Sequence, residues 1–181
     1  MSHPATGHRP DRQNTEQEER AALVRAMGLD RPDARLDEFA RRLASDARTP
    51  YAMVNIFGDT QQFLGLCTPG AQDLLPEVGR SMSLAHGYCP EVVARRSALV
   101  LPDVFASPRF AGNEVVDLIG IRTYAGAPLI HPSGVVLGTV CCVGPQEQPK
   151  STGRASLDLI KGYRDEVMAY LDHRSGRPPT P

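Results

Sequence analysis

The sequence predicts an α+β domain, in which helices at the two ends of the chain pack on one face of a sheet and short helices cover the other face. Long helical patterns lie at the ends, over residues 15–47 and 151–172. Between them, short apolar runs alternate with turn residues, which is typical of strands joined in hairpins. Apolar residues make up 41% of the 181, enough for the core of one domain.

The first part of the chain is expected to hold a tail and two helices. Residues 1–14 are rich in Pro, Gly, His and Arg, so we expect them to be disordered. Thr15 and Glu18 form a capping box that opens an N-terminal helical segment, residues 15–32. The main domain, residues 33–172, begins with a second helix that runs to Ala47. Its apolar stripe consists of Leu36, Phe39, Ala40, Leu43 and Ala47.

The middle of the chain is expected to form strands. The run "YAMVNIF" at 51–57 pairs with 61–66 across the Gly58-Asp59 turn, and a third strand covers 99–103. A late hairpin, 121–130 with 135–143, turns at Pro132-Ser133-Gly134. Short helices are expected after Cys89 and around residues 113–118. A last helix begins at Ser151, and residues 173–181 are expected to be a disordered tail.

Charge and composition exclude several partners. The net charge is −1, so the chain has no general attraction to nucleic acid or to an anionic membrane. No apolar run approaches the roughly 20 residues that span a bilayer, and the N-terminus lacks the hydrophobic centre of a signal peptide. We therefore expect a cytoplasmic protein that binds neither nucleic acid nor membrane.

The cysteines show no metal-binding spacing. There are four of them, at positions 67, 89, 141 and 142, and none forms a C-x-x-C pair. The spacing of a structural zinc site is therefore absent, and four free thiols are expected in a reducing compartment.

Four runs carry a family resemblance: "YAMVNIFGDTQQFLG" (51–65), "HGYCPEVV" (86–93), "ALVLPDVFASPRFAGNEVV" (98–116) and "GIRTYAGAPLIHPSGVVLGTVCCV" (120–143). Together they resemble the GAF domain family, in the form of a bacterial, stand-alone sensor of small molecules or redox state. The resemblance covers about residues 33–172. It implies a six-stranded antiparallel sheet with a ligand pocket under the short helices and a homodimer formed through the terminal helices. It also implies a signal passed to a separate protein.

Departures from the better-known branches narrow this expectation. Bilin-binding members attach pigment at a cysteine followed by histidine, whereas Pro90 follows Cys89 here. The patterns of cyclic-nucleotide binders and the cysteine spacing of free methionine sulfoxide reductases are also missing. Since no Ser-His-Asp, Walker or metal-hydrolase motif is present, we expect no enzyme. One enzyme alternative stays open, a thiol reductase of sulfoxide or peroxide.

Cys89 is the residue on which these alternatives depend. Proline is favoured in the first helical turn, so Pro90 is expected to start a helix whose dipole lowers the pKa of the Cys89 thiol, with Glu91 opposing it. Cys89 is then either a small apolar filler or a pocket or redox thiol. In the redox interpretation, Cys67 or Cys141 would be the resolving thiol.

The candidate pocket lies between the sheet and residues 84–125. On its strand, Cys141 is expected to face the pocket while Cys142 faces the terminal helices. A weaker alternative is a metal or haem site formed by His86, Cys89 and a strand cysteine. A further alternative is a ligand-free dimerisation module. The cofactor is unknown. The expected lining residues are Tyr88, Cys89, Val92, Phe105, Tyr124, Thr139 and Cys141.

Overall fold

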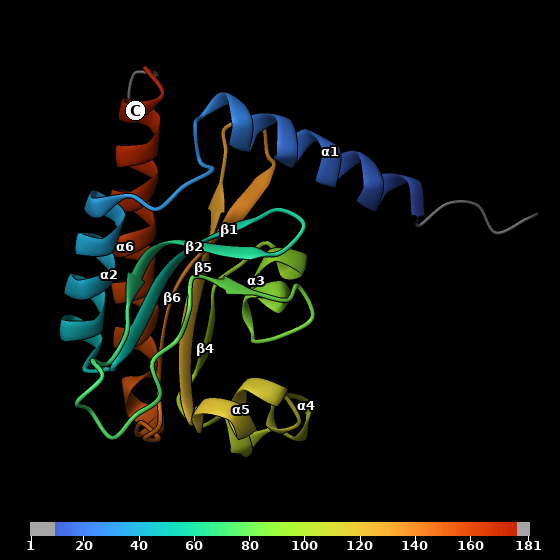
Figure 1. Ribbon diagram of the computed structural model, residues 1–181. Helices are drawn as coiled ribbons and strands as arrows, with labels where there is room; N and C mark the ends of the chain where they lie inside the picture. Colours follow the sequence, from blue (N-terminus) through green and yellow to red (C-terminus); the bar gives the residue numbers. More distant parts are fainter. Residues whose placement is uncertain (1–9, 177–181) are drawn as a thin grey trace, which may run out of the picture.

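A single antiparallel sheet organises the chain. The computed structural model describes residues 10–176 and contains six strands in the order β3-β2-β1-β6-β5-β4 (Figure 1). The predicted α+β class with a six-stranded antiparallel sheet is confirmed. The strands are β1 (Tyr51–Phe57), β2 (Gln61–Cys67), β3 (Ser81–Met82), β4 (Leu99–Leu101), β5 (Thr123–Ile130) and β6 (Val136–Gly144).

Helices cover both faces of this sheet. The long helices α2 and α6 lie on one face, and the short helices α3, α4 and α5 lie on the other (Figure 1). Within residues 10–176, no helix is both long and apolar enough to cross a membrane. The helices are α1 (Pro10–Ala26), α2 (Ala34–Ala47), α3 (Cys89–Arg95), α4 (Pro108–Ala111), α5 (Glu114–Ile119) and α6 (Gly153–Arg174), with 3-10 turns η1 (Val104–Ala106) and η2 (Lys150–Thr152).

Helix α2 packs directly on β2. The Asp33 side chain caps it by accepting the Arg35 N–H at 2.8 Å, and the apolar stripe that includes Leu36 is buried on the sheet. The backbone of Leu36 comes so close to Gly65 that a Cβ on Gly65 would collide with it. The glycine therefore permits the close approach of helix and strand.

Both ends of the domain are more helical than the sequence indicated. Helix α1 begins at Pro10 instead of Thr15, so residues 10–14 are helical; proline in the first turn suits that start. Helix α6 continues through Arg174, whose guanidinium pairs with Asp33 at 2.7 Å. The rest of the two expected tails, residues 1–9 and 177–181, lies outside the described residues.

Alternation along β6 separates two cores. Cys141 and Cys142 point to opposite faces, as expected for neighbours on a strand. The helix-side core joins the sheet to α2 and α6 and includes Leu36, Leu43, Val140, Cys142, Ile160 and Leu171. The opposite core lies under the short helices and includes Tyr51, Met53, Tyr88, Cys89, Val92, Tyr124 and Cys141.

Candidate functional site

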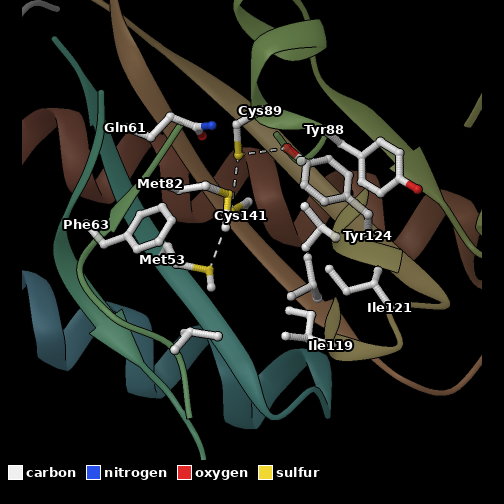
Figure 2. A pocket seen from close by; sticks show the side chains of 14 residues that line it. Met53, Gln61, Phe63, Met82, Tyr88, Cys89, Ile119, Ile121, Tyr124 and Cys141 are labelled. Atoms are coloured by element: carbon white, nitrogen blue, oxygen red, sulfur yellow. Dashed lines mark hydrogen bonds between the residues drawn. The ribbon is translucent and has the colours of Figure 1, made fainter. Parts of the chain in front are cut away.

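A small cavity lies between the sheet and the short helices (Figure 2). About 40 Å³ of it is open to water-sized molecules, which is room for about two or three waters. Its wall is formed by Met53, Gln61, Phe63, Val78, Met82, Gly87, Tyr88, Cys89, Val115, Ile119, Ile121, Tyr124, Cys141 and Val143.

The structure brings four of the seven expected residues to this wall. Tyr88, Cys89, Tyr124 and Cys141 line the cavity. Val92 and Thr139 do not. Both are fully buried in the surrounding structure, Val92 because α3 turns it down into the core beneath the helix.

The expectation for Phe105 is wrong. Its side chain is 50% exposed on the 3-10 turn η1, and the Arg122 guanidinium lies 4.8 Å from its ring centroid. Asp103 explains this placement, since its carboxylate accepts the Phe105 N–H at 3.1 Å and also binds Arg122 at 3.2 Å. The turn is thereby held with Phe105 outward, away from the cavity.

Several lining residues escaped the sequence analysis, among them Met53 and Gln61. Alternation along β1 puts Met53 on the pocket face, where it lies opposite Cys141 in the β1–β6 register. Gln61 is buried and donates to the carbonyls of Ser83 (2.7 Å) and His86 (2.8 Å). The sequence does contain a signal for Gln61, namely a glutamine at the start of an apolar strand. A buried amide there needs hydrogen-bond partners such as these carbonyls.

Two thiols form the chemically distinctive part of the wall. Cys89 Sγ lies 3.5 Å from Cys141 Sγ and 3.4 Å from Tyr124 Oη, and Cys141 Sγ lies 3.9 Å from Met53 Sδ (Figure 2). With both thiols protonated, Cys89 donates to Cys141, which donates to the thioether. Cys89 is the first residue of α3 and Pro90 the second, so the helix starts one residue before the position that the sequence predicted.

The two thiols differ in acidity. The pKa of Cys89 lies below the ordinary value of 9.0, above all because Cys141 can turn its S–H toward the thiolate. Burial opposes this shift, and side-chain hydrogen bonds from Thr139, Tyr124 and Asn55 add to it. The pKa of Cys141 is raised well above 9.0, first by that same hydrogen bond and then by burial. Cys89 is therefore the more acidic thiol of the pair, and side-chain donors lower its pKa.

The hydroxyl of Thr139 can donate a hydrogen bond to the Cys89 thiolate. Within the described part of the chain, buried Thr139 Oγ1 has no hydrogen-bond partner. A buried hydroxyl without a partner is costly, and an adjacent thiolate relieves that cost. Thr139 thus stabilises the ionised form of Cys89 from behind the cavity wall.

A glycine allows the tyrosine to reach the thiol. The ring of Tyr124 lies over Gly126, two residues along β5, and a Cβ on Gly126 would collide with Tyr124 Oη. The absence of a side chain at 126 therefore leaves the hydroxyl free to extend along the strand to Cys89.

The family follows from comparison with known proteins. The family model for the GAF domain matches residues 31–163, well over half of the chain. The chain belongs to the GAF domain family. A comparison with curated protein sequences found no match.

Solved structures share this GAF fold at low sequence identity. The type II free methionine-R-sulfoxide reductase from Thermoplasma acidophilum is 9% identical, with a TM-score of 0.59 over 82% of this chain and 96% of that one. The GAF domain of an Acinetobacter phosphoenolpyruvate-protein phosphotransferase is 12% identical, with a TM-score of 0.57 over 90% and 96%. The A. aeolicus nlh2 GAF domain is 15% identical, with a TM-score of 0.57 over 89% and 98%. At these identities the likeness establishes the fold alone.

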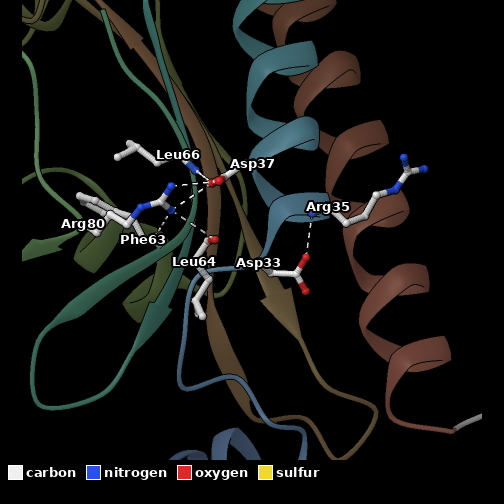
Figure 3. Close-up of polar contacts among 7 residues, drawn as sticks. All are labelled: Asp33, Arg35, Asp37, Phe63, Leu64, Leu66 and Arg80. Atoms are coloured by element: carbon white, nitrogen blue, oxygen red, sulfur yellow. Dashed lines mark hydrogen bonds and ion pairs between the residues drawn. The ribbon is translucent and has the colours of Figure 1, made fainter. Parts of the chain in front are cut away.

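An ion pair ties the segment that covers the cavity to helix α2 of this GAF domain. Arg80 follows the loop 68–79, which contributes Val78 to the wall, and binds both carboxylate oxygens of Asp37 at 3.0 Å (Figure 3). Asp37 also accepts the N–H of Leu66 at 2.9 Å, so one carboxylate joins α2, β2 and the cover. Such a bidentate pair fixes direction as well as distance.

His86 does not line the cavity with Cys89 and Cys141. The imidazole of His86 pairs with Glu114 at 2.6 Å, and it is not among the side chains of the cavity wall. Residues 10–176 contain no group of three or more His, Cys, Asp or Glu side chains placed to hold a metal ion.

Proposed function

We propose that this GAF domain is a sensor that binds a small uncharged molecule in the cavity beside Cys89 and passes the signal to a separate protein. GAF domains are a family of small-ligand-binding sensors. The observation that carries the proposal is the cavity itself, where Cys89 Sγ and Tyr124 Oη meet at 3.4 Å within a largely apolar wall that also includes Gln61. A few convergent polar groups in an apolar pocket are the usual arrangement of a small-molecule site.

The wall favours an uncharged ligand. Among the described side chains that form it, none is Asp, Glu, Lys, Arg or His. A phosphate or carboxylate group would therefore lose its hydration without gaining a counter-charge. This argues against nucleotides, and also against free methionine sulfoxide, which carries an ammonium and a carboxylate.

The size of the cavity favours a molecule of a few heavy atoms. About 40 Å³ is far below the several hundred Å³ of typical organic-ligand pockets. A tetrapyrrole such as haem is much too large for this space. Small uncharged oxidants and dissolved gases fit both the volume and the chemistry of the wall.

The sheet offers a route from the cavity to the terminal helices. Cys141 faces the cavity, while the next residue, Cys142, packs in the core with α2 and α6. A displacement of β6 on ligand binding would therefore reach the helices that we propose as the dimer and output surface. We propose a cytoplasmic location, with neither nucleic acid nor membrane as partner.

Methionine methyl groups provide the test. Met53 and Met82 line the cavity, whereas Met27 and Met168 belong to the helix-side core. With ¹³C-methyl methionine labels and xenon as an uncharged probe, we expect shifts at Met53 and Met82 alone. Equal shifts at all four methyl groups, or none at Met53 and Met82, would contradict the proposal.

Two tryptophan variants on α5 make a matched pair for this test. Ile119→Trp places a large ring at the cavity wall and should abolish the xenon-induced shifts. Leu118→Trp, at the neighbouring residue whose side chain is 69% exposed, should leave them unchanged. Undiminished binding in Ile119→Trp would place the probe outside this cavity.

A further inference from the structure

Two buried thiols face each other across the inner wall of the cavity. Cys89 and Cys141 are 6% and 1% exposed, and their sulfur atoms are 3.5 Å apart. They come from different layers, because Cys89 begins α3 while Cys141 lies in the middle of β6. A disulfide needs an S–S distance of about 2.05 Å, so the sulfur atoms must approach by only about 1.5 Å.

We propose that Cys89 and Cys141 are a peroxide-reactive pair, in which hydrogen peroxide entering the cavity converts the two thiols into a disulfide. The inference rests on the proposed function, since it names the class of molecule that the cavity admits. Hydrogen peroxide is uncharged, has two heavy atoms and forms hydrogen bonds, so it satisfies both the volume and the polarity of the wall.

The first step is attack by Cys89. Its thiolate attacks one oxygen of the peroxide, the O–O bond breaks, and an S–O bond forms, leaving Cys89 as the sulfenic acid. The departing hydroxide takes up the proton that Cys89 had released and becomes water. Sulfur is oxidised and peroxide oxygen is reduced. Tyr124 Oη, at 3.4 Å from Cys89 Sγ, is a positioning group that can donate to the thiolate.

The second step is closure by Cys141. Its sulfur attacks the Cys89 sulfur, the S–O bond breaks, and the leaving hydroxide combines with the Cys141 proton to form a second water. The sum is two thiols and one hydrogen peroxide giving one disulfide and two waters. Cys141 is already in contact with Cys89, so the sulfenic acid meets its resolving thiol without diffusion.

The other two cysteines are excluded from the pair by position. Cys142 points to the opposite face of the sheet, into the core with α2 and α6. Cys67 is half-buried near Pro50 at the far end of β2, and it is not part of the cavity wall. Each therefore serves as an internal control, because peroxide that oxidised any thiol without selectivity would also oxidise Cys67 and Cys142.

The test exposes the reduced full-length chain to hydrogen peroxide and then blocks free thiols in denaturant. Before blocking, we expect the intact mass to fall by two hydrogens per chain. After blocking, we expect two blocking groups per chain where the reduced chain takes four, and peptide mapping should find Cys89 linked to Cys141. The Cys142→Ser and Cys67→Ser variants should form the same link. Cys141→Ser should stop at a Cys89 sulfenic acid that dimedone traps, and Cys89→Ser should leave Cys141 reduced.

Three outcomes would overturn the inference. They are free Cys89 and Cys141 thiols in a folded, peroxide-treated chain, a link that involves Cys67 or Cys142, or methionine sulfoxide formed in place of the disulfide. Circular dichroism checks the fold, and Cys89→Ala replaces Cys89→Ser if the latter unfolds. Failure here is distinct from failure of the proposed function: xenon shifts at Met53 and Met82 without a disulfide would leave the sensor proposal standing.

Discussion

Cys89 Sγ lies 3.5 Å from Cys141 Sγ although 52 positions separate the two residues. The two sides of this contact are held in different ways. Cys141 belongs to β6, which is hydrogen-bonded to β1 on one side and β5 on the other. Cys89 starts α3, a helix of seven residues. A structural change on disulfide formation is therefore expected at α3, with the centre of the sheet held in place.

A bulky thiol reagent should modify the four cysteines at different rates. Of the four cysteines, Cys67 is half-buried and the other three are buried. We therefore expect N-ethylmaleimide to label Cys67 first in the folded chain, even though burial raises the pKa of that thiol. Mass mapping after brief labelling measures this. Modification of Cys89 ahead of Cys67 would show a cavity open to reagents far larger than peroxide.

The thiol pair should give the stability of the fold a pH dependence. The pKa of Cys89 is lower in the folded chain than the ordinary value of 9.0, so just below 9.0 the unfolded chain binds more protons. The free energy of unfolding should rise with pH there, and this contribution is lost as the pH falls through the folded pKa. Cys141, with its pKa raised, reverses the trend above 9.0.

Urea denaturation between about pH 7 and pH 9 measures this effect. The difference in unfolding free energy between the wild type and Cys89→Ala should grow with pH over this range. The side chains that face Cys89 and titrate are Cys141 and Tyr124, and the pKa of Tyr124 is also raised well above its ordinary value, so neither ionises in this window. A constant difference would show that Cys89 stays protonated.

Replacing Gly126 should displace the Tyr124 side chain, two residues earlier on β5, from Cys89. In Gly126→Ala the new methyl group would collide with Tyr124 Oη, so the ring must move away from Cys89. We expect a loss of about 1–3 kcal/mol of stability, the usual cost of overpacking, together with slower oxidation of Cys89. Tyr124→Phe is the control, because it removes the hydroxyl without forcing the ring aside. Unchanged oxidation in both variants would assign Tyr124 a packing role alone.

Sequence patterns located most of the strands and the faces on which their residues lie. Period-two alternation placed Cys141 and Cys142 on opposite faces, and the Cys89-Pro90 pair marked the start of α3, because local sterics govern both features. The two-residue strand β3 was missed, since Ser81–Met82 is too short to show a period.

The wall of the cavity was only partly predictable, for physical reasons. Met53 and Gln61 reach it through the pairing of β1 with β6 and β2, which depends on contacts distant in sequence. Phe105 is an apolar residue in a loop beside the pocket segment, and only the capping carboxylate of Asp103 decides that its ring points outward. The lowered pKa of Cys89 likewise arises from donors on β1, β5 and β6, which the local sequence does not contain.

Helix α1 should be stabilised by a second copy of the chain. A homodimer through the terminal helices is expected, but Leu23, Val24 and Met27 of α1 are not free for it, because the domain itself buries Met27 and half-buries the other two. Before Leu23, α1 meets the domain through polar contacts, since Arg20 donates to the Val136 carbonyl and Glu16 pairs with Arg96. The start of the helix projects beyond the rest of the domain (Figure 1), and polar helices are marginal in water. We expect light scattering to give a mass above 19.6 kDa, and helical content to fall on dilution. A mass of 19.6 kDa with dilution-independent helicity would contradict a dimer.

The ion pair between Asp37 and Arg80 should control access to Cys89. Asp37→Asn removes the charge that holds Arg80 and weakens the anchor of the loop 68–79, at a cost of about 1 kcal/mol for a partly buried pair. We expect faster N-ethylmaleimide labelling of Cys89, because the cover then opens more often. Arg35→Gln is the matched control: it breaks the exposed Arg35–Glu38 pair on the same helix, which does not touch the cover (Figure 3). Equal labelling rates in the two variants would mean that the Asp37–Arg80 pair does not control access to Cys89.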